Sequence, residues 1–501
     1  MMTYNNPIIS GFYPDPSVCK KDDRYYMVCS SFNYFPGVPL FESVDLINWT
    51  PIGNVLTKPE QLDLTGEGNA GGIYAPTIRC HNGRFYMVTT HVSKKHFFVY
   101  TDDIYGEWSD PVWVNQEGID PSLYFERDTV YFMSNGHDKE GKPAVLQCEI
   151  DIETGKKRTE TKVIWHGTGG RYLEAPHLYL INDTYYLLAS EGGTEYGHMV
   201  VYATSHTPYG PFKNAPHNPI LTNRDLGGYP IQGAGHGDLI QDNDGNWWLP
   251  HLAFRPQGPY ENYHHLGREV YLVPMSIYPN GKLTTDTNGI TPTQVTTTKL
   301  PPSLVQQPLP IYTFDEENWH KEWLFLRNPD KQNYQITKGQ LHLYPSTTTL
   351  NDTTYSPTFI ALRQRSMDGK LSVKLTAPQG EAGITLYMNE THHYEFALIN
   401  TGSNITLIKR RTIGDMTFIA HCQQLDTDTV TLHITFDKSH YHFKAATQNA
   451  LIDFGSAQVK YLSKEVADGF TGVVMGLYAQ TEVATKTPPA TFTNFYCEFK
   501  Q

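Results

Sequence analysis

Residues 15–26, DPSVCKKDDRYY, contain the pattern that decides the fold: a short segment, a turn signal and a pair of large aromatic residues. The pattern recurs four more times, and its second aromatic always lies 11 positions after its start. The starts are Asp15, Ala75, Asp120, Ala175 and Gly237, and the aromatics are Tyr26, Tyr86, Tyr131, Tyr186 and Trp248. A constant offset of this size predicts one strand, a tight turn and the beginning of the next strand.

The spacing of these repeats indicates how the strands are organised. Successive aromatics lie 45 to 62 residues apart, near the ~40–50 residues of a propeller blade with room for insertions. Further strand-like stretches follow in several units, such as LFESVDLINW at 40–49 and FVYTDDIYGEW at 98–108. Aromatic pairs after turns occur in many β-proteins, but five equal offsets are hard to obtain by chance. We therefore predict a five-bladed β-propeller over residues 1–290.

The second half of the chain has a different pattern. Residues 291–310, TPTQVTTTKLPPSLVQQPLP, contain five prolines and one charged residue, which is typical of an extended linker. Beyond it, TVTLHITF (429–436) and LSVKLTAP (371–378) alternate between apolar and polar residues. We expect a jelly-roll-like β-sandwich of roughly ten strands over residues 311–501, so that the whole chain is all-β.

Composition excludes several classes of partner and compartment. The 501 residues carry 39 Lys and Arg against 52 Asp and Glu, a net charge of −13, which argues against nucleic-acid binding. The N-terminus has no secretory signal and no apolar run is long enough to span a membrane, so we expect a cytoplasmic protein with no membrane partner. The six cysteines form no CxxC pair and suit buried reduced thiols better than disulfides or a zinc site.

Three carboxylates are the informative residues of the repeats. The innermost strand of each blade lines the central channel of a propeller, so Asp15, Asp120 and Glu174 should converge there from three blades. The same strands offer Tyr74 with Thr77, His177, and His236 with Asp238. Burying like charges together moves their pKa values apart, which is what acid–base catalysis requires. An inverting glycosidase needs such a pair, ~6.5–9.5 Å apart with room for water.

Each carboxylate also has a structural interpretation. Asp-Pro is a frequent strand-start pair, so the two DPS copies at Asp15 and Asp120 could be blade caps. Glu174 is different, because it interrupts the repeat in GGRYLEAPHLY, a segment too apolar for a solvated surface glutamate. We therefore favour functional roles for all three residues, with Asp120 as an orienting charge.

Six segments of the first half stand out: NPIISGFYPDPSV, GGIYAPTIR, GIDPSLYF, RYLEAPHLY, GAGHGDLI and HHLGREVYLVP. Together they resemble glycoside hydrolase family 43. The linker with FLRNP and IALRQR resembles the β-sandwich appended to the β-xylosidase and α-L-arabinofuranosidase branch of that family. The resemblance covers nearly the whole chain and implies an inverting exo-glycosidase on a five-bladed propeller.

The resemblance also implies roles for individual residues. Asp15 matches the general base that activates water, Glu174 the general acid, and Asp120 the carboxylate that raises the pKa of the acid and orients it. Arg268, in LGRE, matches an arginine that contacts sugar hydroxyls or this carboxylate.

Two further positions are implied in the same way. His236 matches a central histidine beside a calcium ion or a water in the channel, and no other cofactor is expected. Phe32, in SSFNYFPG, matches an aromatic wall of the pocket for the terminal sugar.

The sequence departs from the family pattern at two places. The xylosidase pattern has Trp where this chain has Tyr74, in the expected pocket floor, and Tyr is similar to members that lean towards arabinofuranosides. Near the C-terminus, LYAQTEVATKTPPATF (477–492) replaces the loop that usually reaches back to the active site.

These observations predict an exo-acting inverting enzyme that releases terminal α-L-arabinofuranosyl units from arabino- and arabinoxylo-oligosaccharides. A β-D-xylosidase acting on 1,4-β-xylo-oligosaccharides, or a dual-activity enzyme of hemicellulose degradation, is the nearest alternative, because a small steric change can switch pentose preference. A sugar-binding propeller without catalysis, or a structural interaction propeller, is disfavoured because all three carboxylates are present. We also expect a homo-oligomer, either a dimer or a tetramer.

Overall fold

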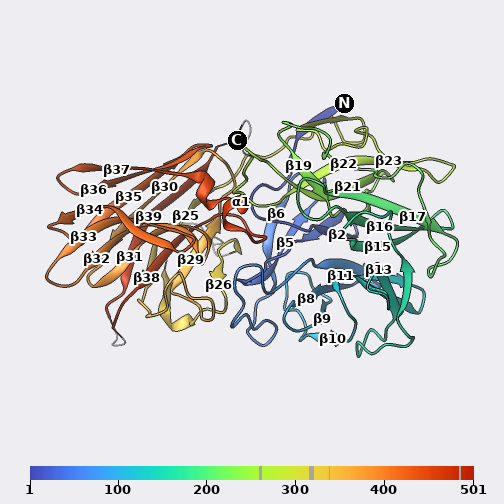
Figure 1. Cartoon of the computed structure of the whole chain (residues 1–501), viewed down its shortest axis with the longest axis horizontal. Coiled ribbons are helices and arrows are strands. Elements are labelled where there is room, and N and C mark those ends of the chain that lie inside the picture. The colour runs from blue at the N-terminus through green and yellow to red at the C-terminus, as the bar shows by residue number, and fades with distance from the viewer. Residues whose placement is uncertain (259–261, 315–320, 338, 484–486, 501) are drawn as a thin grey trace.

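The computed structural model describes the chain except for residues 259–261, 315–320, 338, 484–486 and 501. Two β domains lie side by side, with the N-terminal domain in blue to green and the C-terminal domain in yellow to red (Figure 1). The described helices are short: η2 (Lys331–Asn333), η3 (Val459–Leu462) and α1 (Lys464–Ala467). None of the described helices is long and apolar enough to cross a membrane.

In the described part of the N-terminal domain, five sheets of antiparallel strands form the blades, one for each predicted repeat. The first blade is β2 (Ser17–Lys21), β3 (Arg24–Val28), β5 (Gly37–Ser43) and β6 (Thr50–Leu56). The second is β7 (Thr77–His81), β8 (Arg84–Thr90), β9 (His96–Thr101) and β10 (Val112–Val114). The third is β11 (Ile119–Glu126), β12 (Thr129–His137), β13 (Pro143–Glu149) and β14 (Lys162–Trp165).

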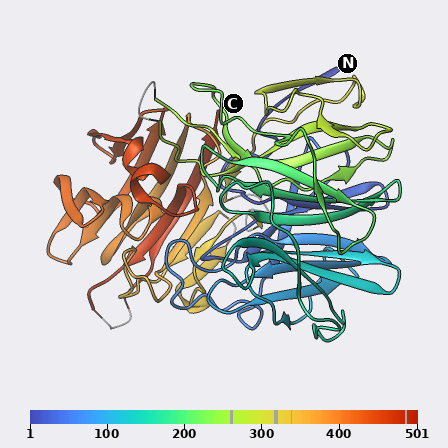
Figure 2. The same cartoon turned by 45° about the vertical axis from the view of Figure 1, so that its right-hand side comes forward.

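The fourth and fifth blades complete the propeller (Figure 2). The fourth is β15 (Glu174–Ile181), β16 (Thr184–Glu191), β17 (Met199–Ser205) and β18 (Lys213–Asn214). The fifth is β19 (Gln232–Gly235), β20 (Ile240–Gln241), β21 (Trp247–Phe254), β22 (Glu269–Ile277) and β23 (Leu283–Thr285). Four of the repeats therefore give the first strand, a tight turn and the second strand of a blade, as their offset predicts. In the fifth, β19 lies before the repeat, which supplies the short β20 and the beginning of β21.

Part of the predicted linker belongs to the propeller. Residues 294–297 form β24, which pairs antiparallel with β1 (Met2–Asn5) at the N-terminus. Thr291 is buried, and its hydroxyl lies 2.7 Å from Nε2 of His251 in β21. The segment expected as an extended linker over 291–310 thus pairs with the propeller at 294–297, where the β-branched run TQVTTT supplies a partner for the edge of β1.

The C-terminal domain is a sandwich of two sheets, and in its described part they contain fourteen strands, more than the roughly ten expected. One sheet is β25 (Ile311–Thr313), β27 (Tyr334–Thr337), β28 (Gln340–Leu343), β39 (Ala490–Phe499), β30 (Gly369–Thr376), β35 (Thr429–Phe436), β36 (His440–Ala446) and β37 (Leu451–Gln458). The other is β29 (Phe359–Arg363), β38 (Val474–Gln480), β31 (Gly380–Asn389), β32 (His392–Asn400), β33 (Ile405–Ile413) and β34 (Met416–Leu425). Strands such as β34 do not follow the alternation of a half-buried strand, since nine of its ten residues are exposed.

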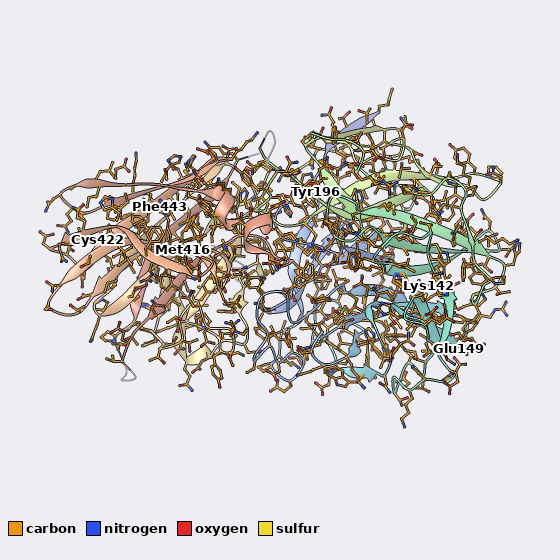
Figure 3. All side chains as sticks on the ribbon, in the orientation of Figure 1. Lys142, Glu149, Tyr196, Met416, Cys422 and Phe443 are labelled. Carbon is orange, nitrogen blue, oxygen red and sulfur yellow. The ribbon has the colours of Figure 1, made fainter. Side chains whose placement is uncertain are left out.

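The two segments whose alternation predicted the sandwich pair with each other. Leu371 of β30 lies opposite Ile434 of β35, and Val373 lies opposite Leu432. All four side chains are buried in the core between the sheets. The expectation of buried cysteines holds for four of the six, because Cys80 is half-buried and Cys422 on β34 is exposed, on the side of the sandwich away from the propeller (Figure 3).

The two domains are joined by backbone pairing and by a short crossing segment. Strand β4 (Tyr34–Phe35) of the propeller pairs with β26 (Phe325–Leu326). The segment 463–473 lies against the propeller, where Glu465 Oε1 is 2.7 Å from Nδ1 of His264. A Cβ on Gly472 would lie 2.4 Å from the carbonyl oxygen of Leu266, so only glycine permits this close approach.

Candidate active site

The first strands of the blades surround the channel. Strand β7 contacts both β2 and β11, β11 contacts β15, and β2 also contacts β20. At the ends of these strands is a small pocket with a volume of about 60 Å³. Its lining contains every site residue expected from the sequence: Asp15, Phe32, Tyr74, Asp120, Glu174, His236 and Arg268.

Backbone irregularities aim these side chains into the pocket. Asp15, Asp120 and His236 have φ values of 58°, 51° and 51°, a left-handed conformation that is uncommon for residues other than glycine. The register of β11 shifts between Ile119 and Ser122, and that of β15 shifts after Glu174. Such bulges turn side chains out of the regular alternation and are frequent beside active sites.

Asp15 is buried and held by a donor on each oxygen. Arg268 Nη1 donates to Oδ1 at 2.8 Å, and the Ser30 hydroxyl donates to Oδ2 at 2.5 Å. Nδ1 of His236 lies 3.5 Å from Oδ1. Burial alone would raise the pKa of Asp15, but Arg268, His236 and the Ser30 hydrogen bond outweigh it, so the pKa is lowered. Asp15 is therefore ionised at neutral pH.

Asp120 and Glu174 have the opposite shift. Burial, the charge of Glu174 and the charge of Asp15 raise the pKa of Asp120 well above its usual value. Burial and the charge of Asp15 raise the pKa of Glu174 to about 7, against the lowering effect of Arg268. Ala175 directly follows Glu174, and its backbone N–H donates to Asp120 Oδ2 at 3.1 Å. This hydrogen bond connects the Asp120 carboxyl to the backbone next to Glu174. The pair thus retains a proton near neutral pH.

Aromatic rings form one wall of the pocket. Phe32 lies 5.3 Å from Tyr74 and 5.7 Å from Phe470, measured between ring centroids. The guanidinium carbon of Arg268 lies 5.7 Å from the centroids of both phenylalanine rings. The Tyr74 hydroxyl donates to the carbonyl oxygen of Ala70 at 2.6 Å, so the ring is held in place.

Three functional candidates were missed in the sequence: Thr194, His198 and Phe470 all line the pocket. Thr194 lies beside the arginine, with its Oγ1 accepting from Arg268 Nη1 at 3.0 Å. The segment EGGTEYGH, at 191–198, could have drawn attention to the first two as a polar, glycine-rich interruption after β16. Phe470 has no comparable signal, because it reaches the pocket from the other domain.

The protonation of His198 follows from its partner. The residue is buried, and its Nδ1 lies 3.2 Å from the carbonyl oxygen of Gly233. Because a carbonyl only accepts, Nδ1 carries the proton and Nε2 is left as an acceptor. Burial lowers the pKa of His198 to about 3, so the ring is neutral at neutral pH.

The segment that reaches the pocket from the sandwich is not the one singled out in the sequence. Phe470 belongs to the crossing segment 463–473 before β38. The residues on either side of the undescribed part of the 477–492 segment do not line the pocket. Val483 and Thr487 line a separate hollow with Asp330 and Tyr344. Residues 484–486 of that segment lie outside the described residues.

Other polar residues of the first strands form a second group, apart from the pocket. Arg79 donates to both oxygens of Asp238, at 2.8 and 3.0 Å. Its Nη2 also lies 3.0 Å from Nδ1 of His177, and the Tyr179 hydroxyl donates to Asp238 at 2.5 Å. This buried network joins four blades, counting the 2.7 Å hydrogen bond from the Ser17 hydroxyl to Asp238.

The residues near His236 do not fit a protein-held calcium ion. Calcium takes six to eight oxygen ligands, whereas no group of three or more His, Cys, Asp or Glu side chains in the described structure could hold a metal. Asp15, the carboxylate that pairs with His236, already accepts from Arg268 and Ser30.

Comparison with known families accounts for both domains. The family model for glycosyl hydrolases family 43 matches residues 4–283. The model for the beta xylosidase C-terminal concanavalin A-like domain matches residues 312–498.

Similar proteins match over their full length. The chain is 36% identical to the non-reducing end alpha-L-arabinofuranosidase BoGH43B of Bacteroides ovatus, covering 98% of this chain and 94% of that protein. It is 32% identical to a xylosidase/arabinosidase of Butyrivibrio fibrisolvens, covering 100% and 98%. The solved structure of Bacteroides ovatus Xyloglucan PUL GH43B superposes with a TM-score of 0.93 at 35% identity, covering 99% of this chain and all of that one.

Proposed function

The chain belongs to glycosyl hydrolase family 43, and we propose that it releases terminal α-L-arabinofuranosyl residues from oligosaccharides with inversion at the anomeric carbon. It is a glycoside hydrolase by family membership. The observation that carries the proposal is the opposite direction of the pKa shifts in one pocket: the pKa of Asp15 is lowered, and those of Asp120 and Glu174 are raised.

Asp15 is the general base of the proposed mechanism. Its ionised carboxylate takes a proton from a water molecule, and the water oxygen bonds to the anomeric carbon on the face opposite the leaving group. Arg268 and Ser30 hold the carboxylate in one orientation throughout. They also keep it ionised before the reaction, so no proton has to be removed from it first.

Glu174 is the general acid. It donates its proton to the glycosidic oxygen as the bond from that oxygen to the anomeric carbon breaks. A pKa raised to about 7 leaves a large fraction of the carboxyl protonated at neutral pH, which suits this role. Asp120 positions the acid by accepting a hydrogen bond from the backbone N–H of Ala175, the residue that follows Glu174. The products are the free sugar with inverted configuration and the shortened oligosaccharide.

The shape of the pocket supports exo action. It is small, and Phe470 closes the side that faces the sandwich. Phe32 and Tyr74 offer ring faces to the sugar, and Arg268, Thr194 and His198 offer polar groups to its hydroxyls. A pocket of this kind takes one terminal sugar rather than the middle of a polymer.

Dual activity on α-L-arabinofuranosides and β-D-xylopyranosides is the second candidate. It is favoured by the similarity to the xylosidase/arabinosidase of Butyrivibrio fibrisolvens. Tyr74 favours the arabinofuranoside, because the family pattern for xylosidases has the larger Trp in this wall. We further propose that the enzyme acts in the cytoplasm, on short oligosaccharides derived from hemicellulose, as a dimer or tetramer.

The test compares initial rates on 4-nitrophenyl α-L-arabinofuranoside and 4-nitrophenyl β-D-xylopyranoside, with Asp15→Ala as the inactive control. We expect faster hydrolysis of the arabinofuranoside, loss of it in the variant, and release of the inverted anomer by NMR. A preference for the xylopyranoside would keep the mechanism and change the substrate. Inactivity of the folded protein on both would overturn the proposal.

A further inference from the structure

A second hollow adjoins the catalytic pocket on the propeller. It has a volume of about 740 Å³ and lies between the second and third blades. Ile119, the residue before Asp120, lines both hollows. We call the second one the lysine groove, because its lining includes Lys94, Lys95, Lys139 and Lys157.

The lysine groove opens on the same face of the propeller as the pocket. Strands alternate in direction within a blade, so the connection from β8 to β9 lies at the end where β7 begins. The connection from β12 to β13 lies, for the same reason, at the end where β11 begins with Ile119. The first connection carries Lys94 and Lys95, and the second carries Lys139. A substrate whose terminal sugar occupies the pocket can therefore extend over these lysines.

The groove is cationic in an otherwise acidic chain. The net charge of the protein is −13, yet the groove has four lysines against two carboxylates, Glu117 and Asp138. The Asp138 carboxylate is engaged in its own turn, where it accepts from the backbone N–H groups of Glu140 and Lys142, each at 2.9 Å. The Asp138 carboxylate is thus bound by backbone N–H groups of its own hairpin and not by a lysine of the groove.

The lysines have few acidic partners. Lys95 and Lys157 donate to the neutral oxygens of Asn115 and Thr161, at 2.8 and 2.7 Å. Nζ of Lys94 lies 3.6 Å from Oδ2 of Asp63, and Lys139 has no ion pair within the described part of the chain. Most of the positive charge is therefore available to a ligand.

We propose that the lysine groove binds a leaving group that carries carboxylates, so that the enzyme prefers oligosaccharides bearing uronic acid units next to the sugar it releases. This inference rests on the proposed function, because it assigns the groove to the leaving-group side of the cleaved bond. Ammonium groups facing a carboxylate across water-accessible space attract it over about a Debye length. The preference is therefore expected to weaken as salt is added.

The test uses two arabinosylated xylo-oligosaccharides that differ only by a glucuronic acid substituent on the xylose backbone. The variant Lys94→Glu/Lys139→Glu reverses two charges at exposed hairpin positions. Lys282→Glu is the matched control, since Lys282 is an exposed hairpin residue between β22 and β23, on the opposite face of the propeller. The measured quantity is the ratio of kcat/KM on the acidic substrate to kcat/KM on the neutral one.

We expect the ratio to exceed one in the unmodified protein, to fall about threefold to tenfold in the double variant, and to be unchanged in Lys282→Glu. Sodium chloride at 0.5 M should reduce it towards the value of the variant. Equal ratios in the unmodified protein and the double variant would overturn the inference.

A separate measurement tests the proposed function: the rate at which the unmodified protein hydrolyses 4-nitrophenyl α-L-arabinofuranoside. If that rate is zero, calorimetric binding of the acidic and neutral oligosaccharides decides the inference. Tighter binding of the acidic one, lost in Lys94→Glu/Lys139→Glu, supports the groove, and equal binding overturns it.

Discussion

Phe470 of the sandwich domain stacks on Phe32 of the propeller, with ring centroids 5.7 Å apart and ring planes inclined by 21°. The carbonyl oxygen of Phe470 also accepts from Arg268 Nη2 at 3.3 Å, and that arginine holds Asp15. The sandwich thus supplies a wall of the pocket and a contact to the residue that orients the proposed base. It is part of the catalytic unit rather than an appended module.

Replacing Phe470 with Ala should reduce kcat/KM on the arabinofuranoside about tenfold, from the loss of an aromatic wall and its packing on Phe32. The midpoint of thermal unfolding should change little, because Phe470 is only partly buried. Val466→Ala, an exposed position in the same segment, is the control for both measurements. Unchanged kinetics in Phe470→Ala would mean that the sandwich does not contribute to sugar binding.

Arg268→Gln should move the acidic limb of the pH–rate profile to higher pH. Burial raises the pKa of Asp15 and Arg268 is the largest influence that lowers it, so the pKa rises when the arginine charge is removed. Since the base must be ionised, activity is then lost at a higher pH as the solution is acidified. The measurement is kcat/KM from about pH 4 to 8. Arg84→Gln, at an exposed ion pair with Asp102, should leave the limb in place, and an unmoved limb in Arg268→Gln would contradict the assignment.

Glu174→Gln should lower kcat on natural oligosaccharides by about 10²–10⁴, the usual contribution of a general acid. The loss should be smaller for aryl glycosides with acidic leaving groups, which depart without a proton. The basic limb near pH 7, set by the raised pKa of Glu174, should disappear. Sugar affinity should persist in calorimetry. A binding protein without catalysis would behave identically with Glu or Gln, which separates the two classes.

The backbone of the propeller could be predicted from the sequence because its signal is geometric. An 11-residue offset fixes a strand, a turn and a second strand, and so places Asp15, Asp120 and the neighbour of Ala175 at equivalent strand ends. The same logic did not separate His236 from Asp238. Both residues lie between β19 and β20 rather than on a regular strand, and His236 has a left-handed φ of 51°. The histidine therefore lines the pocket, whereas the aspartate joins the network with Arg79.

What the sequence could not predict lies between the domains. Phe470 is distant in sequence from the propeller residues that it contacts, and no periodicity of its own segment marks it. Its position depends on backbone contact at Gly472, where a Cβ would collide with Leu266. Strand β24 was missed for a similar reason, since its partner β1 is nearly 300 residues away and the prolines around it favoured a linker.

Tyr74→Trp should shift preference towards the β-D-xylopyranoside. The tyrosine hydroxyl donates to Ala70 at 2.6 Å, and the ring packs on Phe32 and Phe470. A larger indole loses that hydrogen bond and reshapes the wall next to the sugar, for which an effect of about 1–3 kcal/mol on discrimination is usual. The ratio of the two nitrophenyl rates measures it. Tyr74→Phe keeps the ring and serves as control; a ratio unaffected by Trp would remove Tyr74 as a specificity residue.

Asp238→Asn should destabilise the propeller by about 3–5 kcal/mol, because it leaves the buried Arg79 without its charge partner. Burial would raise the pKa of Asp238, but the charge and hydrogen bonds of Arg79, with the Ser17 hydroxyl, lower it well below its usual value. A carboxyl whose pKa is lowered by folding contributes stability above its unfolded pKa of about 3.9, and loses it as the pH falls towards the folded value. The midpoint of thermal unfolding should therefore be lower in the variant at pH 7, and the difference should shrink when both proteins are measured near pH 3.

Asp102→Asn, at an exposed pair with Arg84, should melt like the unmodified protein at both pH values. If Asp238→Asn also melts like the unmodified protein at pH 7, the network is not what holds the four blades together beneath the pocket.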